Sequence, residues 1–580
     1  MNLSTAGRTV QLLKRICDIR TATQPFVPPT GEKPSLPLRS SRQPFERVTP
    51  ESQGISSHHI RNFLAELGQG GDLYMQTVLI LRNEKLLCAA AYGAQTLDAA
   101  KYTFSACKSI TSLAIGLLID DGLLRTDTPV TQLLSDCLTP AASRRLRDLT
   151  VEDLLTMRSG IMFTEVQTTT ESDWLRCILS DTLSQEPGTQ FRYNSMNTYL
   201  LSVIVCRITG ESLSSFLQRR LFEPMGITDT LWECSADGFE KGGWGLYIRP
   251  EDAAKLGQLV LNGGVWKNER LISHEYLEAA TAHHVSPSPV LGDFDYGYQI
   301  WVGRQENTFL FNGMLGQNVM GFRDSGILIV TNAGADTDYQ QSRFFEIVSR
   351  FFGGVFPETV PENPQAHQQL TEFIRTLSYY ERDAVPLSPA VDPFFDRRFV
   401  TSDPRAASTG LFPLLLQILH NSYTTGFASL SLSRRGNLPE LIYREHDATH
   451  RLTVGLGKPH LTELNFCGNI YRVAAHGHFT HDEEERPVFY IRLDFLETPS
   501  VRILKLILTG EGMILRQNET PGGPYIFEKL RTAAHQPLIR PLLHISVGSS
   551  EEDYLSYKVK QLIAPELHMT AESYPLSSDR

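Results

Sequence analysis

The chain has 580 residues, of which 41% are hydrophobic and 21% are charged, and its formal net charge is −11 at pH 7. This length exceeds what one hydrophobic core supports, so we expect two or three globular domains. The negative charge gives no electrostatic basis for binding nucleic acid, and we expect no such partner.

The cysteines are scattered without paired spacing, and several lie within apolar runs. There are eight, at positions 17, 88, 107, 137, 177, 206, 234 and 467. This pattern favours buried free thiols in a reducing compartment, and we expect a cytoplasmic protein. No apolar run is long enough for a transmembrane helix.

Residues 1–45 are basic and poor in acidic side chains, and a proline-rich stretch covers residues 25–44. A transit peptide has a similar composition. We favour the alternative, in which a short helix near residues 10–16 is followed by an extended arm on the outside of the first domain.

Residues 46–356 alternate between helical and strand patterns. Ser56 and Ser57 can cap a helix that carries Ile60 and Phe63. Strands are predicted at residues 76–81, 85–90, 308–312, 318–322 and 327–331. Helices are predicted at about residues 105–119, 149–160, 197–206, 252–262 and 340–352. This order predicts an α+β fold, in which an antiparallel sheet is covered by helices and an all-helical subdomain is inserted.

A proline-rich stretch at residues 357–364 marks the expected domain boundary. Residues 357–400 are interpreted as a linker with a connector helix, and residues 401–580 as a β-rich accessory domain. Alternating patterns predict strands there at residues 428–432, 452–456, 488–495, 501–508 and 512–515. We therefore expect a small antiparallel sheet or barrel.

Ser105 and Lys108 lie three residues apart, at the amino end of a helix whose apolar run covers residues 113–119. Positions i and i+3 share one helix face, so the amine of Lys108 is expected beside the hydroxyl of Ser105. A serine becomes a good nucleophile when a neighbouring base takes its proton. Burial lowers the pKa of a lysine, which allows Lys108 to act as that base.

Two further segments strengthen this pair. They are Tyr193-Asn194-Ser195 and residues 311–317, which read Phe-Asn-Gly-Met-Leu-Gly-Gln. In order and spacing the three motifs resemble the serine β-lactamase and penicillin-binding-protein superfamily, especially its class C β-lactamase and esterase branch. Supporting sequence lies at residues 47–55, 149–160, 187–193, 242–246 and 296–301. The resemblance covers residues 46–355 and implies the β-lactamase/transpeptidase-like fold.

The resemblance also implies a role for each matching residue. Ser105 is the acylated nucleophile, Lys108 is its base or proton shuttle, and Tyr193 is the second proton carrier. The oxyanion hole is formed by the backbone N–H groups of Ser105 and Met314, and each such donor is worth roughly 3–4 kcal/mol. No cofactor or metal is implied. The implied substrate-binding residues are Ser195, Phe311, Asn312 and Gly313.

Two positions depart from the superfamily pattern. Ser195 stands where the second motif usually has asparagine, and Phe311 stands where the third motif usually has lysine or histidine. A phenylalanine can neither hold a substrate carboxylate nor move a proton. Both departures disfavour an efficient β-lactamase and suit the esterase, amidase or peptidase members.

We therefore expect a serine hydrolase that acts on a small-molecule ester, an amide or a short peptide. Two alternatives remain. One is a non-catalytic protein of the same fold that serves binding or assembly, and the other is a true β-lactamase or DD-peptidase.

Two other groups carry possible chemistry. Cys107 lies within the first motif but on another helix face, which favours a packed thiol over a nucleophile. His476 and His478 share a strand face, and His481 is close in sequence, which is compatible with a metal site. We favour a polar hairpin loop, because the charged residues 482–485 follow directly, and we expect no metal.

Overall fold

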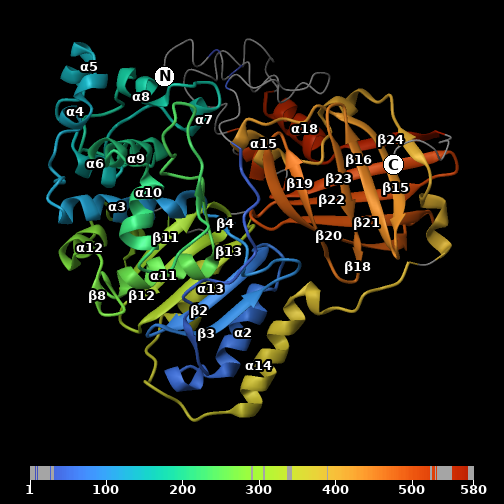
Figure 1. Cartoon of the computed structure of the whole chain (residues 1–580), viewed down its shortest axis with the longest axis horizontal. Coiled ribbons are helices and arrows are strands. Elements are labelled where there is room, and N and C mark those ends of the chain that lie inside the picture. The colour runs from blue at the N-terminus through green and yellow to red at the C-terminus, as the bar shows by residue number, and fades with distance from the viewer. Residues whose placement is uncertain are drawn as a thin grey trace. The chain divides into compact units, whose positions relative to one another are not determined.

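The computed structural model describes residues 32–288, 292–304, 307–335, 342–387, 389–522, 525–528 and 551–572, together with Gly7, Val10, Val27 and Arg531. The chain divides into two compact units (Figure 1). The first unit comprises residues 36–92 and 96–377, and the second comprises residues 2–35, 93–95 and 378–580. Each unit has its own hydrophobic core.

The first unit is built on an eight-stranded sheet with the strand order β1-β3-β2-β13-β12-β11-β10-β9. Five longer strands confirm the predicted ones: β2 (Met75–Arg82), β3 (Lys85–Ala91), β11 (Thr308–Gly313), β12 (Gln317–Phe322) and β13 (Ile327–Ala333). The short strands β1 (Glu46–Arg47), β9 (Phe294–Tyr296) and β10 (Trp301–Gly303) complete the sheet. Neighbouring strands are antiparallel except β1 and β3, which are parallel.

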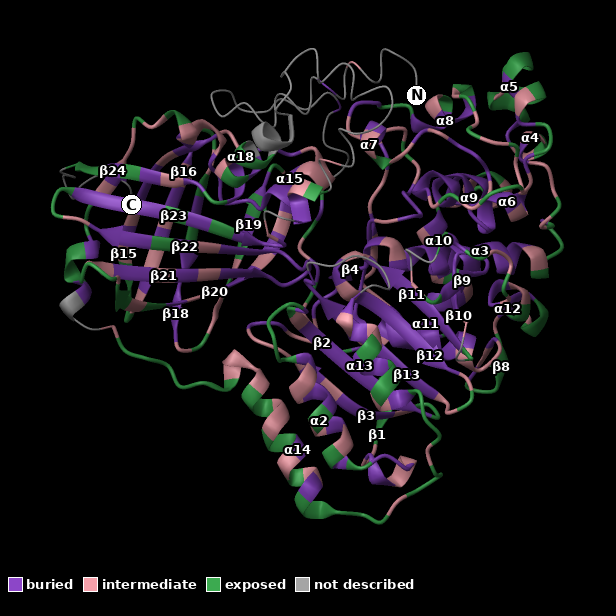
Figure 2. Cartoon of the chain, turned by 180° about the vertical axis from the view of Figure 1, so that it is seen from behind, coloured by how far each residue is buried: buried purple, intermediate pink, exposed green. Residues whose placement is uncertain are grey.

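Both faces of this sheet are buried (Figure 2). On β2, Val78 and Ile80 belong to one hydrophobic cluster, whereas Leu79 and Leu81 belong to another. The first cluster includes side chains of α2 (Ser57–Leu67) and α13 (Arg343–Phe352), and the second includes those of α3 (Cys107–Asp120) and α11 (Pro250–Leu261). Successive side chains of a strand point to opposite faces, so burial of both faces explains the continuous apolar runs in the sequence.

Between β3 and β11 the chain forms the predicted helical subdomain. Besides α3, its main helices are α6 (Val151–Leu155), α8 (Trp174–Ser180), α9 (Ser195–Thr209) and α10 (Leu213–Leu217). A capping box begins α6, since the side chains of Thr150 and Asp153 each bond the other residue's backbone N–H. The helix nevertheless ends well before Gly160. Met157 has a φ of 59°, and a left-handed residue of this kind cannot continue a right-handed helix.

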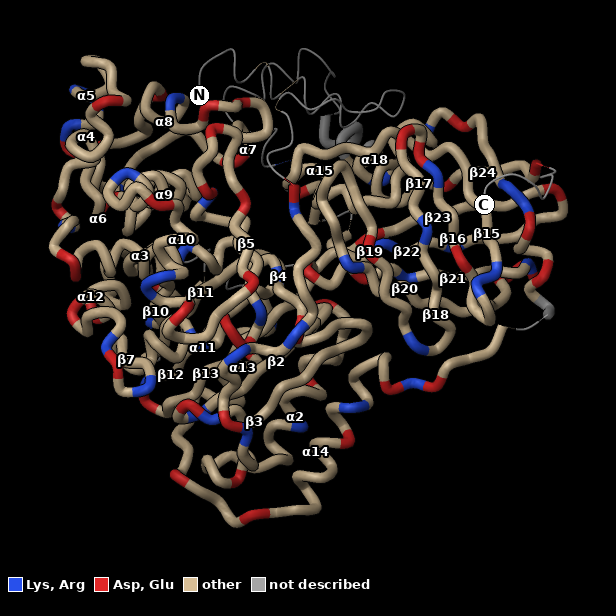
Figure 3. The backbone as a smooth tube through the Cα atoms, viewed as in Figure 1, with Lys and Arg blue, Asp and Glu red and all other residues tan. Residues whose placement is uncertain are grey.

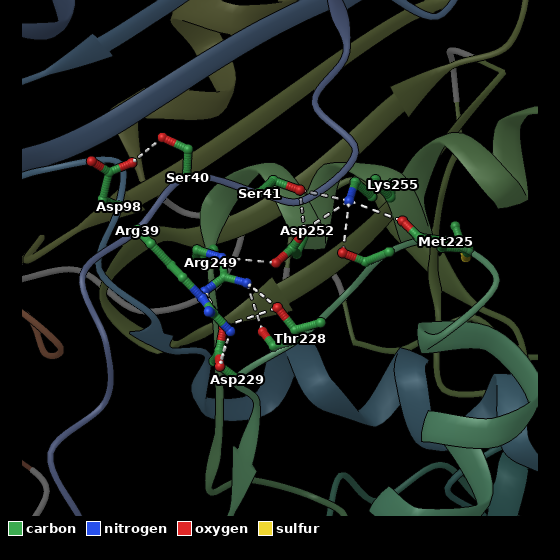
Figure 4. A network of polar contacts seen from close by, with 11 residues as sticks. Arg39, Ser40, Ser41, Asp98, Met225, Thr228, Asp229, Arg249, Asp252 and Lys255 are labelled. Atoms are coloured by element: carbon green, nitrogen blue, oxygen red, sulfur yellow. Dashed lines mark hydrogen bonds and ion pairs between the residues drawn. The ribbon is translucent and has the colours of Figure 1, made fainter.

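A buried polar network ties the start of the first unit to α11 (Figure 4). Asp252 accepts hydrogen bonds from Lys255 Nζ at 2.9 Å, Arg249 Nε at 3.0 Å and Ser41 Oγ at 2.6 Å. Arg249 also donates to Asp229 at 2.9 Å. Asp252 and Lys255 are fully buried, and burial lowers the pKa of Lys255. Charged side chains that are removed from solvent need such partners, so loss of one member leaves the other charges of the network buried and unpaired.

The described part of the amino-terminal stretch differs from the expected external arm. Ser41 is buried in the first unit, as the network shows. Lys33 is buried in the second unit, where its backbone N–H donates to Asn469 Oδ1 at 3.2 Å and its amine donates to the Ile470 carbonyl at 2.5 Å. Lysine is buried when its charge and donors have partners, which explains the inward position. Apart from Val10, the predicted short helix lies outside the described residues.

The first unit extends past the expected boundary at residues 357–364. Helix α14 (Pro364–Leu377) corresponds to the connector helix expected within residues 357–400. It buries Leu370 in the same hydrophobic cluster as α2, and the two units divide after Leu377. A proline-rich stretch indicates where regular structure is interrupted, but the division between units depends on where packing ends.

The second unit is a barrel-like, mainly antiparallel domain, whose 11-stranded sheet is larger than the small sheet expected. The strand order is β17-β16-β15-β14-β24-β23-β22-β21-β20-β18, and β19 pairs with β20. The predicted strands correspond to β15 (Phe427–Arg435), β17 (Thr449–Thr453) with β18 (Gly455–Leu456), β21 (Pro487–Phe495), β22 (Val501–Leu508) and β23 (Gly512–Thr520). The unpredicted strands are β14 (Arg398–Val400), β16 (Leu438–Glu445), β19 (His460–Phe466), β20 (Asn469–His481) and β24 (Glu566–Glu572).

The predicted histidine-rich hairpin is part of this second sheet. His476 lies within β20 and its Nε2 is 3.4 Å from a carboxylate oxygen of Asp494, while the ring of His478 stacks on Tyr490. Among the described residues, no group of three or more His, Cys, Asp or Glu side chains could hold a metal ion. The neighbours of these histidines are therefore those of a sheet surface.

The described cysteines, which are all except Cys17, are free thiols. Over the described ranges, no single helix is long and apolar enough to cross a membrane, although the bent pair of α9 with residues Leu213–Phe222 meets the length and composition test.

Candidate active site

Ser105 lies in a tight turn at the start of the buried helix α3. A short helix, η2 (Phe104–Ala106), precedes α3 directly, so the helical segment begins where the sequence predicts. Phe104 has a φ of 47°, which costs about 1–2 kcal/mol for a residue with a side chain. Ser105 is partly exposed, whereas the residues from Ala106 to Leu118 are buried. The turn therefore presents one hydroxyl at the accessible end of an otherwise buried helix.

The amine of Lys108 lies beside this hydroxyl, as the spacing predicts. Lys108 Nζ is 2.9 Å from Ser105 Oγ, and it donates to the carbonyl of Gly243 at 2.8 Å. The side chain is 1% exposed. Burial lowers the pKa of Lys108 to about 8, although the negative charge of Glu165 acts in the opposite direction. A large fraction of the lysine is thus neutral at mildly alkaline pH and can accept the serine proton.

Tyr193 completes the group of polar atoms around Ser105. Burial raises the pKa of the Tyr193 phenol, and a hydrogen bond with Ser105 lowers it. The Lys108 amine lies 5.0 Å from the centroid of the Tyr193 ring, and the ring of Trp301 stacks on that of Tyr193 with the two centroids 6.0 Å apart. The structure thus brings together Ser105, Lys108 and Tyr193, although the distance in sequence from Tyr193 to the other two predicts no contact by itself.

Gly313 ends β11 directly beside the turn of Ser105. A Cβ atom at Gly313 would lie 2.2 Å from the carbonyl oxygen of Thr103 and 3.1 Å from the backbone nitrogen of Ala106. The strand therefore reaches the turn because position 313 has no side chain. Met314 follows as the first residue of η6 (Met314–Gly316). The oxyanion-hole role of its N–H, with that of Ser105, stays a prediction.

This close approach gives a testable prediction for Gly313→Ala. The added methyl group collides with backbone atoms, so the strand end must move away from Ser105, and we expect kcat/KM for an ester to fall at least about tenfold, as for small displacements of catalytic groups. Gly354→Ala is the control, because no atom lies within 4 Å of a Cβ built there. Equal turnover by both variants would contradict the role of the approach.

The other expected substrate-binding residues make structural contacts. Phe311 is 1% exposed and packs in the core with Phe309, and Asn312 donates through Nδ2 to Asn318 Oδ1 at 2.7 Å. Ser195 is the buried first residue of α9. The roles of Phe311, Asn312 and Ser195 in binding a substrate stay predictions, and the burial of Phe311 leaves the place of the usual cation filled by an apolar ring.

Asn194 has a structural task that explains the altered second motif. Its Oδ1 accepts the N–H of Met196 and caps α9, while its Nδ2 donates to the carbonyls of Ile161 at 3.0 Å and Phe163 at 2.8 Å. The side chain is 2% exposed. Asn194 therefore holds the segment of Tyr193 in place and does not offer its amide to a substrate.

Sequence reasoning missed the contribution of Glu165. This residue is the exposed first residue of α7 (Glu165–Thr168), and its Oε1 accepts the N–H of Ser195 at 3.0 Å. Thr164 and Gln167 form a capping box, which is the signal that marks a helix start in the sequence. The contact with Ser195 depends on the fold of the subdomain and has no local signal.

The loop that holds Lys108 is fixed by a buried ion pair. Lys241 Nζ lies 2.7 Å from Glu233 Oε2, and both side chains are less than 10% exposed. Gly243 follows in the same loop and accepts the hydrogen bond of Lys108.

Cys107, expected to be a packed thiol, is 0% exposed and donates to the carbonyl of Phe104. Burial raises the pKa of this thiol to about 12. It is therefore not a thiolate at neutral pH.

Residues 60–345 match the family model described as Beta-lactamase. Curated relatives include "Protein flp" of Staphylococcus aureus (strain COL), 27% identical over 199 residues, and the 6-aminohexanoate-dimer hydrolase of Paenarthrobacter ureafaciens, 27% identical over 292 residues. A lovastatin esterase of Penicillium rubens is 27% identical over 213 residues. These alignments cover 32%, 45% and 32% of this chain, and 39%, 73% and 53% of the respective relatives.

Among solved structures, a putative 6-aminohexanoate-dimer hydrolase from Bacillus anthracis aligns with a TM-score of 0.45 and 16% identity. The alignment covers 56% of this chain and 90% of that chain.

Proposed function

We propose that this chain, which belongs to the β-lactamase family, is a serine hydrolase that cleaves an ester or amide bond through an acyl-enzyme on Ser105. The observation that carries the proposal is the 2.9 Å contact between Lys108 Nζ and Ser105 Oγ, made by a buried lysine with a lowered pKa. Small-molecule esters, amides and short peptides are the proposed substrates. The names of two relatives, a lovastatin esterase and a 6-aminohexanoate-dimer hydrolase, support this range.

The proposed reaction has two halves. In acylation, neutral Lys108 takes the proton of Ser105 as Oγ attacks the carbonyl carbon. The leaving group then departs with a proton from Tyr193, and Lys108 passes its proton to Tyr193. In deacylation, Tyr193 and Lys108 relay a proton from the attacking water to Ser105 Oγ. The bond between the acyl carbon and Oγ then breaks, and the acid product leaves. The backbone N–H groups of Ser105 and Met314 stabilise the oxyanion in both halves.

The alternatives receive less support from the site. A true β-lactamase or DD-peptidase usually holds a substrate carboxylate with a cation, and here the buried ring of Phe311 occupies that position. A non-catalytic protein of this fold has no need for a buried lysine beside a serine hydroxyl, since burial of an amine costs free energy.

A fluorophosphonate probe with intact-mass analysis tests the proposal. We expect one covalent adduct on the wild-type chain and none on Ser105→Ala, because the probe requires an activated serine. A survey of esters and short peptides then measures turnover that depends on Ser105. Identical labelling and turnover by both chains would leave the non-catalytic alternative.

The pH profile of a neutral ester gives a second prediction. Because neutral Lys108 is the base, we expect kcat/KM to rise with pH and to level off above about pH 8. Turnover by Ser105→Ala is subtracted at each pH as the background. A profile that is flat between about pH 6 and about pH 9 would remove Lys108 from the role of base.

A further inference from the structure

Glu165 is a carboxylate on the solvent side of the proposed site. It is exposed, whereas Ser195, which it contacts, and Lys108, whose pKa its charge raises, are buried. One oxygen, Oε1, accepts the N–H of Ser195 at 3.0 Å, and Ser195 lies two positions after Tyr193. This contact fixes the position of the carboxylate, so its charge has a defined place beside the reacting groups.

The segment that carries Glu165 is also held from its other side. Gln167 is fully buried and its Oε1 accepts the backbone N–H of Thr164 at 2.7 Å and the Thr164 hydroxyl at 2.8 Å. The first turn of α7 is thus anchored at Thr164 and at Ser195. A carboxylate held at both ends of its segment keeps its direction better than a side chain on a free loop.

The charge of Glu165 reaches both proton carriers. It acts to raise the pKa of Lys108 and that of Tyr193. A substrate group that lies beside these residues therefore lies within the same field.

Among the described residues, no lysine, arginine or histidine side chain forms an ion pair with Glu165. Lys108 is neutral when it acts as the base, and Lys241 is paired with Glu233 at 2.7 Å. Arg192 is exposed and donates to Met162 Sδ at 2.8 Å. Phe311 occupies the place where the superfamily usually has a cation.

We propose that Glu165 selects substrates by charge: it favours esters or amides with an ammonium group near the scissile bond and disfavours those with a carboxylate or sulfonate. This inference rests on the proposed function, since it names the substrate class of the same site. Glu165 acts in binding and takes no proton from the substrate.

Nitrophenyl esters of three butanoic acids test this. At the far carbon the acids carry a trimethylammonio group, a tert-butyl group or a sulfonate, which have similar volumes and do not attack the ester. Assays run at about pH 9.5, where Lys108 is mostly neutral in every variant, so that a change at Glu165 does not act through the base. The readout is the kcat/KM of each charged ester relative to the neutral one.

We expect wild type to prefer the cationic over the anionic ester by about tenfold or more, and the preference to shrink in high salt. Glu165→Gln can still accept the N–H of Ser195, so it removes only the charge, and we expect it to abolish the preference. Glu165→Lys should reverse it, and Glu165→Asp should keep its direction. Glu186→Gln changes an exposed glutamate outside the site and should keep the wild-type ratio.

Two negative results have different meanings. If wild type turns over the neutral ester through Ser105 but shows no charge preference, or if Glu165→Gln keeps the preference, the role of Glu165 is refuted and the proposed function stands. If none of the three esters is turned over in a manner that depends on Ser105, both the proposed function and this inference are refuted.

Discussion

Lys108→Met is expected to lower the rate of ester turnover by about 10²–10⁴, the usual contribution of a general base. Methionine is close to lysine in length and fills the same buried space, but it removes the amine between Ser105 Oγ and the carbonyl of Gly243. The acylation rate is measured by single-turnover kinetics with intact-mass detection. Thermal unfolding of the variant establishes that the first unit remains folded.

Cys107→Ala is the matched control for this variant, because Cys107 is the neighbouring buried residue of α3. We expect it to keep turnover within about threefold of wild type, since burial holds the thiol in its protonated form. Near-normal turnover by Lys108→Met would remove the lysine from the mechanism. A similar loss in both variants would indicate damage to the helix in place of loss of a base.

Asp252→Ala is expected to destabilise the first unit by about 3–5 kcal/mol, the usual cost of removing one partner of a buried ion pair. The substitution leaves Lys255 and Arg249 without the carboxylate between them, and Asp252 and Lys255 are fully buried. Urea unfolding followed by tryptophan fluorescence measures the midpoint of the first-unit transition. Asp252→Asn keeps the shape and removes the charge, so it should also lower the midpoint.

Asp127→Ala provides the comparison, because Asp127 also bonds an arginine, Arg125, but both side chains are exposed. We expect no measurable change in its midpoint, since an exposed ion pair exchanges easily with water. If Asp252→Ala unfolds at the same denaturant concentration as Asp127→Ala, the buried network does not hold the unit together.

The sequence predicts the first unit better than the second for a physical reason. Strands such as β2 and β13 are buried on both faces, and their continuous apolar residues leave a strong local signal. In the second unit, β16 contains Pro439 and β20 contains Gly477. Proline and glycine are weak strand formers, so these sequences give a weaker local signal. The strand structure of β16 depends on its pairing with β15, and that of β20 on its pairing with β21. The local sequence pattern of a strand does not indicate this pairing.

The candidate site likewise contains some contacts that the local sequence predicts and others that it does not. Ser105 and Lys108 lie on one helix, so their spacing alone predicts the contact. Tyr193 and Gly313 are found because their motifs occur in a recognisable order. The contact between Glu165 and Ser195 joins two segments of the helical subdomain, and no spacing rule brings them together. The buried position of Phe311 likewise depends on which strand face meets the core.

The burial of Lys33 in the second unit has a consequence for synthesis of the chain. Lys33 bonds to Asn469, 436 residues later in the sequence. At the usual ribosomal rate of about 5–20 residues per second, the partner emerges roughly 20–90 seconds after the lysine does. During this interval the first unit can fold, whereas the backbone N–H and the amine of Lys33 do not yet have their partners in the second unit. The second unit can therefore be completed only after the chain has been synthesised at least as far as Asn469.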